Sequence, residues 1–155
     1  MTSSETLPPV EDLLPHRGTM LLLDRVTEFA ADTVVAEYAP RADAWYSDDK
    51  GNMVAWVGIE LMAQTVAAHV ALTKRLIGLP VKMGALLGTR SYRTNTASFA
   101  SGRILQIHAR EVFRDESGLA GYECAIACGG MQLAEAVLKV YEPEDFGRFM
   151  QGKQP

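Results

Sequence analysis

A single long apolar segment constrains the fold more than any other feature of the chain. It runs from Val54 to Leu72 and is interrupted by only four polar residues, one of which carries a carboxyl group. Those interruptions favour a buried core helix over a membrane span. Gly78 and Pro80 follow at a distance where they would stop a helix, so we predict one helix from about Val54 to Ile77.

Segments rich in β-compatible residues lie on both sides of this helix. Two precede it, Met20–Phe29 and Thr33–Tyr38, and their short link suggests a hairpin. Four longer segments, separated by glycine-containing turns, should form a meander after it: residues 83–92, 103–113, 119–128 and 131–141. One helix must then cover a whole sheet. We therefore predict an α+β hot-dog fold, a long central helix wrapped by an antiparallel sheet of about five to six strands.

The length and the globular composition fit a single domain over residues 1–155, with a flexible tail at 1–9 and a C-terminal tail at 144–155. The start lacks a basic region followed by an apolar one, so we expect a cytoplasmic protein. Cys124 and Cys128 fit small core residues better than a redox or metal pair. No metal site and no cofactor are expected, because metal-ligand spacings, phosphate loops and the G-x-S-x-G motif are missing from the sequence.

Glu60 is the one carboxylate of the apolar segment, and a buried carboxylate is costly unless it is paired, hydrogen-bonded or protonated. Gln64, four residues later, shares its helical face and could orient it. Gly58, near the helix start, would let a ligand approach backbone N–H groups. A catalytic carboxylate and a structural one that complements the first helical turn remain equally open from these residues alone.

Three histidines could supply a second catalytic group. His69 lies about half a turn out of phase with Glu60, so we expect it to face away and to be structural. His108 alternates with polar residues and favours a solvated strand face. His16, in the sequence LPHRG between a proline and a glycine, is the best candidate, although a loop histidine bonded to backbone is a fair alternative.

Two motifs together resemble a known family. LPHRGTMLLLDRV at residues 14–26 is similar to the amino-terminal segment of the FabZ-type 3-hydroxyacyl-acyl-carrier-protein dehydratases, and GIELMAQ at 58–64 is similar to their central helix. GALLGTRSYRTN, from residue 84, resembles the strand after that helix. The likeness spans roughly residues 12–140. It is closer still to the dehydratase-like proteins of aryl-polyene gene clusters.

The resemblance implies elimination of water from a 3-hydroxyacyl thioester held by a carrier protein, in fatty acid or polyene biosynthesis. It makes Glu60 the catalytic carboxylate, Gln64 its supporting amide and Gly58 part of the backbone that polarises the thioester carbonyl. The family's histidine precedes the helix, and the matching stretch here, near Tyr46, has none. We therefore expect His16 to replace it, with Tyr46 as second choice, since elimination needs both a base and an acid.

Other functions remain open on the same fold. In an acyl thioesterase, Glu60 would activate water for attack on the thioester. In a non-catalytic partner subunit, the chain would complete the dimer of another dehydratase, and loss of the family's histidine fits that reading. The expected partners are an acyl carrier protein or coenzyme A thioester and a second hot-dog subunit, as homodimer or heterodimer, with no nucleic acid and no membrane.

Charge is segregated along the chain, although its formal total is only -4. Residues 71–110 carry seven basic side chains and no acidic one. In the resembled fold this stretch lines the substrate entrance, so we expect Lys74, Arg75, Arg90 and Arg93 to dock the acidic carrier protein. A solvated basic face is the alternative.

Overall fold

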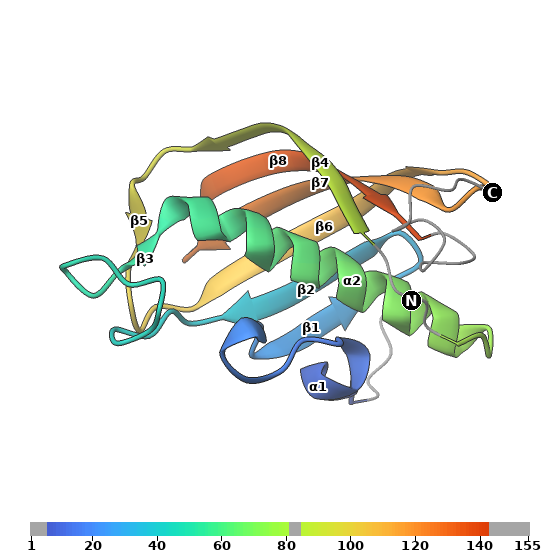
Figure 1. Cartoon of the computed structure of the whole chain (residues 1–155), viewed down its shortest axis with the longest axis horizontal. Helices are drawn as coiled ribbons and strands as arrows, with labels where there is room; N and C mark the ends of the chain where they lie inside the picture. Colours follow the sequence, from blue (N-terminus) through green and yellow to red (C-terminus); the bar gives the residue numbers. More distant parts are fainter. Residues whose placement is uncertain (1–5, 81–84, 143–155) are drawn as a thin grey trace, which may run out of the picture.

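The computed structural model describes residues 6–80 and 85–142. Its central helix α2, Gly58–Leu76, lies across one face of a six-stranded antiparallel sheet that curves around it (Figure 1). A short 3-10 helix, η2 at Ala55–Val57, leads directly into α2. The predicted α+β hot-dog fold is confirmed. The expected C-terminal tail at 144–155 lies outside the described residues, as do residues 1–5 of the expected amino-terminal tail.

The sheet has the strand order β1-β2-β6-β7-β8-β4. Its strands are β1 (Arg25–Phe29), β2 (Thr33–Tyr38), β4 (Ala85–Thr94), β6 (Leu105–Arg114), β7 (Leu119–Cys128) and β8 (Met131–Tyr141). Two short strands, β3 (Met53–Val54) and β5 (Ser98–Phe99), pair near the start of α2. Two further helical turns precede the sheet, α1 (Val10–Leu13) and the 3-10 helix η1 (Gly18–Met20).

The prediction of a four-strand meander after the helix is wrong for its first strand. β4 pairs with β8 at the sheet edge, whereas β6, β7 and β8 do follow one another in space. β6 instead pairs with β2, from Thr33↔Arg110 to Tyr38↔Leu105. The chain therefore passes the start of α2 between β4 and β6, and the helix is wrapped from both sides (Figure 1).

Alternation along the strands places the core between the sheet and α2. On β6, Leu105, Ile107 and Ala109 are buried, while Gln106 and His108 between them are exposed. The inner face carries several alanines, which leave room for the helix to approach closely: Ala36, Ala109, Ala120, Ala134 and Ala136.

The first strand is shorter than predicted. Met20–Phe29 was expected to be one strand, but β1 begins only at Arg25. The side chain of Gln64 on α2 binds the backbone of Met20, Leu22 and Leu23, so these residues find their hydrogen-bond partner on the helix and not on a strand.

α2 ends as the sequence predicts. Gly78 has a φ of +70°, and the N–H groups of Gly78 and Leu79 donate to the carbonyls of Arg75 and Lys74. By length and composition alone, residues 55–76 could span a membrane, but 67% of that window is buried inside the protein. The segment is therefore the core helix of the fold.

Candidate active site

Helix α2 buries one face against the sheet and leaves a second face partly open. Leu61, Met62 and Ala68 are fully buried, whereas Glu60, Ala63 and Ala67 are half-buried. The Glu60 side chain keeps 37% of its exposure. The carboxylate is therefore anchored on a rigid element but remains accessible to a ligand.

Gln64 orients this carboxylate, as its spacing predicts. Its Nε2 donates to Glu60 Oε2 at 3.1 Å and to the Met20 carbonyl at 2.8 Å. Its Oε1 accepts from the N–H of Leu22 at 3.0 Å and of Leu23 at 3.4 Å. Gln64 is fully buried, so these bonds fix both the glutamate and the segment that precedes β1.

His16 and Glu60 lie together although they are distant in sequence. His16 Nε2 is 3.7 Å from Glu60 Oε2, and the histidine side chain keeps 28% of its exposure. Its other nitrogen, Nδ1, is buried and has no hydrogen-bond partner. A separation of 3.7 Å exceeds a normal hydrogen bond, so neither group is locked to the other and both can meet a ligand.

Exposed apolar side chains lie on the segments next to this pair in the fold. Trp56 precedes Glu60 by one helical turn and is 65% exposed, while Met20, whose carbonyl binds Gln64, is 53% exposed. Trp45 is 50% exposed and its Nε1 donates to the Thr19 carbonyl at 3.0 Å. Trp56 was not among the residues predicted from the sequence, although its spacing of four residues from Glu60 was an available signal.

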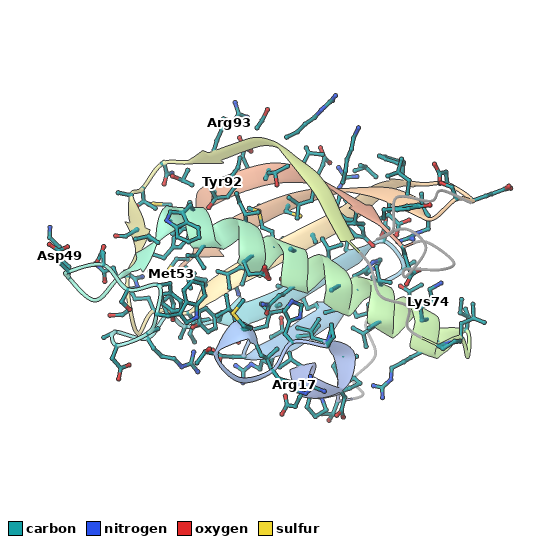
Figure 2. The ribbon with its side chains drawn as sticks, in the orientation of Figure 1. Arg17, Asp49, Met53, Lys74, Tyr92 and Arg93 are labelled. Atoms are coloured by element: carbon teal, nitrogen blue, oxygen red, sulfur yellow. The ribbon has the colours of Figure 1, made fainter. Side chains whose placement is uncertain are left out.

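Gly58 begins α2 and packs too closely for a side chain. A Cβ there would collide with the Tyr92 hydroxyl and would lie 3.0 Å from Ile126 Cδ1. The Gly58 N–H donates to the carbonyls of Ala55 and Trp56, and the Tyr92 hydroxyl donates to the Ala55 oxygen at 2.5 Å. Figure 2 shows Tyr92 over the start of α2. Tyr92 is a second residue near the site that was not predicted from the sequence.

Tyr46 belongs to the core. Its side chain is 3% exposed, and its hydroxyl is bonded to the Tyr38 hydroxyl and accepts the Arg41 N–H at 2.8 Å. The hydroxyl is therefore bound within the protein and not directed at Glu60. We assign Tyr46 no part in the chemistry proposed below.

The other two histidines lie where their sequence positions predict. His69 is fully buried on α2 and bonds Tyr122. His108 is exposed on β6, on the face of the sheet that points away from α2. Neither contacts Glu60.

The four basic residues expected to dock a carrier protein do not form one patch. Lys74 and Arg93 lie toward opposite ends of α2 (Figure 2). Lys74 Nζ pairs with Glu142 Oε1 at 3.2 Å, and Arg93 Nη2 pairs with Glu135 Oε1 at 2.6 Å. Arg75 and Arg90 are exposed.

A comparison with models of protein families identifies the family of this chain. The family model described as "ApeP-like: ApeP dehydratase" matches residues 8–151, nearly the whole chain. The chain belongs to the ApeP-like family. The segment with His16 and the helix with Glu60 and Gln64 both fall within the matched range, so this ApeP-like chain carries its candidate site in the part that defines the family.

Solved structures support the same fold. The ApeP-like chain is similar to a chain of the dehydratase heterocomplex ApeI:P from Xenorhabdus doucetiae, with 25% identity, a TM-score of 0.88, and coverage of 96% of this chain and 100% of that one. No curated protein sequence gives a match.

More distant neighbours show the fold alone. A hypothetical thioesterase with coenzyme A from Streptococcus pneumoniae TIGR4 has 14% identity and a TM-score of 0.61, covering 76% of this chain and 84% of its own. The protein smu.793 from Streptococcus mutans UA159, bound to acetyl coenzyme A, has 13% identity and a TM-score of 0.64, covering 83% and 94%.

Proposed function

We propose that this protein is a dehydratase that eliminates water from a 3-hydroxyacyl thioester on an acyl carrier protein. The observation that carries the proposal is the meeting of His16 and Glu60 at 3.7 Å on the open face of α2. Two comparisons support it. The chain belongs to the ApeP-like family, whose description names a dehydratase, and it is similar to a chain of a dehydratase heterocomplex.

The pair offers the two groups that the elimination needs. One group removes the proton from C2, the electron pair forms the C2–C3 double bond, and hydroxide leaves C3 with a proton from the other group. Gln64 donates to Glu60 Oε2, which leaves Oε1 to exchange a proton with substrate. Backbone N–H groups at the start of α2 would polarise the thioester carbonyl, with Gly58 as the candidate donor.

Mass spectrometry of a 3-hydroxyacyl carrier protein incubated with the protein tests this proposal, with loss of one water expected. Glu60→Gln and His16→Ala should each slow the loss at least about a hundredfold, because each removes a proton-transfer group. His108→Ala is the matched control, since His108 lies on the far face of the sheet. Full activity of His16→Ala would remove His16 from the mechanism.

Thioester hydrolysis is the second candidate function, and one observation favours it. The fold is shared with a hypothetical thioesterase and with a protein that binds acetyl coenzyme A. Glu60 would then activate water for attack on the thioester carbon. Release of free thiol from acyl-coenzyme A marks the hydrolase and separates it from the dehydratase, which leaves the thioester intact.

Assembly with a second hot-dog subunit is part of the proposal. A chain of a heterocomplex is among its structural neighbours, and the exposed Trp56, Met20 and Trp45 beside the site are a surface that a partner subunit would cover. If the chain is a non-catalytic partner, dehydration should occur only after it is mixed with the catalytic subunit. A cytoplasmic location is also part of the proposal, and the two free cysteines are compatible with a reducing compartment.

A further inference from the structure

The edge strand β4 contains an irregularity next to the start of α2. Arg90 lies opposite Val137 on β8 and Arg93 opposite Glu135. The β4 chain therefore advances three residues where β8 advances two, which defines a β-bulge with one extra residue. Within it Ser91 has a φ of +53°, the one positive φ of a non-glycine residue in the described part of the chain.

The extra residue decides which way Tyr92 points. Directly opposed residues of antiparallel strands share a face, and Val137 and Glu135 both alternate with buried residues of β8. Arg90 and Arg93 thus lie on the same, outer face. Strict alternation would place Tyr92 beside Arg90 on the outside. The bulge at Ser91 turns Tyr92 to the inside, toward α2.

There the Tyr92 hydroxyl reaches the backbone that begins α2. It donates to the Ala55 carbonyl at 2.5 Å, the same oxygen that accepts the Gly58 N–H. The space beside Gly58 is filled by this hydroxyl, by Ile126 and by Phe99. Burial raises the pKa of Tyr92 to about 12, so its hydroxyl remains a proton donor at neutral pH.

We propose that Tyr92 is a positioning residue, aimed by the bulge at Ser91, that frees the Gly58 N–H to polarise the substrate carbonyl. The proposal rests on the dehydratase function above. When Gly58 turns its N–H toward the thioester oxygen, the Ala55 carbonyl loses that donor. The Tyr92 hydroxyl keeps this carbonyl paired, so the change does not leave the Ala55 oxygen without a hydrogen-bond donor. The same bond holds the helical turn that leads to Glu60.

Tyr92→Phe tests this role, because it removes one hydroxyl and keeps the ring. With a 3-hydroxyacyl pantetheine thioester, kcat should fall about tenfold, the effect of one hydrogen bond, while KM changes little. An acyl pantetheine that lacks the 3-hydroxyl serves as an unreactive ligand. The infrared stretch of its ¹³C-labelled thioester carbonyl shifts to lower frequency when the carbonyl is polarised. This red-shift should be smaller when the ligand is bound to Tyr92→Phe than when it is bound to the wild type.

Two controls separate this role from general stability. Tyr122→Phe removes a hydroxyl that bonds α2 through His69, away from Glu60, and should lower the melting temperature without changing the infrared shift. Ser91→Gly relieves the positive φ and keeps the bulge, so kcat and the infrared shift should match the wild type.

The outcomes are distinct. If the wild type turns over and Tyr92→Phe keeps both kcat and the infrared shift, the role of Tyr92 is overturned and the dehydratase function stands. If Tyr122→Phe lowers kcat as much as Tyr92→Phe and the infrared shift is equal in both, Tyr92 acts only in folding. No turnover by the wild type would overturn the function and this role together.

Discussion

At the residue scale, the hydrogen bonds of His69 identify its protonated ring nitrogen. Its Nε2 lies 3.2 Å from the carbonyl oxygens of Ala30 and Ala31, which can only accept, so Nε2 carries the hydrogen. Nδ1 then accepts from the Tyr122 hydroxyl at 2.8 Å. Burial lowers the pKa of His69, and the charged groups that face it are Glu111 and Arg114. The histidine is held neutral.

Replacing His69 should change how stability depends on pH. The unfolded histidine binds a proton below its ordinary pKa of about 6.5, whereas the folded one resists it, so wild-type stability falls as the pH falls below that value. The slope from this group reaches about 1.4 kcal/mol per pH unit. His69→Gln should lower stability at neutral pH and flatten the decline between about pH 7 and pH 5.

Thermal melts of the wild type and of His69→Gln across that range measure the difference in slope. His108→Gln is the control. Because His108 is exposed, this variant should have the same slope as the wild type. An unchanged slope in His69→Gln would mean that the buried ring takes up a proton without cost.

At the element scale, one side chain replaces part of a strand. Gln64 satisfies the backbone of Met20, Leu22 and Leu23, and this shortens β1 and holds the segment that carries His16 beside α2. Gln64→Leu should lower the free energy of unfolding by about 2 to 4 kcal/mol, because it removes the hydrogen-bond partner of two buried N–H groups, those of Leu22 and Leu23, and of the partly buried Met20 carbonyl.

Urea unfolding measures that loss, and hydrogen exchange should show faster exchange at the amides of Leu22 and Leu23. Gln106→Leu is the matched control, because Gln106 is exposed on β6 and should change stability by less than about 0.5 kcal/mol. Unchanged exchange at both amides in Gln64→Leu would show that the segment is held by its own packing alone.

At the scale of the whole molecule, the described basic residues expected to dock a carrier protein are spread apart, with Lys74 and Arg93 toward opposite ends of α2. Lys74 is paired with Glu142, so Arg75, which is exposed in the last turn of α2, is the cleaner test of carrier-protein docking. Arg75→Glu should lower kcat/KM for a carrier-bound substrate several-fold, because opposite charges steer the encounter. A pantetheine thioester, which lacks the carrier protein, should react at the wild-type rate.

Lys139→Glu makes the same charge change on the outer face of β8 and is the control. Kinetics at low and high salt complete the measurement, since the Arg75→Glu effect should shrink as salt screens it. An equal loss with both substrates would contradict docking at this end of α2.

Much of the fold follows from local signals in the chain. The strands β7 and β8 begin and end where alternation and glycine turns predict, and α2 ends before the glycine that sequence analysis singled out. These elements depend on residues near one another in sequence. The length of β1 and the place of β4 could not be predicted in this way, because both depend on partners far along the chain: Gln64 for the one and β8 for the other.

The candidate site likewise combines contacts that follow from spacing in the sequence with contacts that depend on tertiary packing. Glu60 and Gln64 share a helical face, so their contact follows from a four-residue spacing. The approach of His16 to Glu60, the burial of the Tyr46 hydroxyl and the turn of Tyr92 toward Ala55 arise only when distant segments pack together. Spacing along a helix or strand limits which side chains share a face. Only the packed chain settles which faces meet.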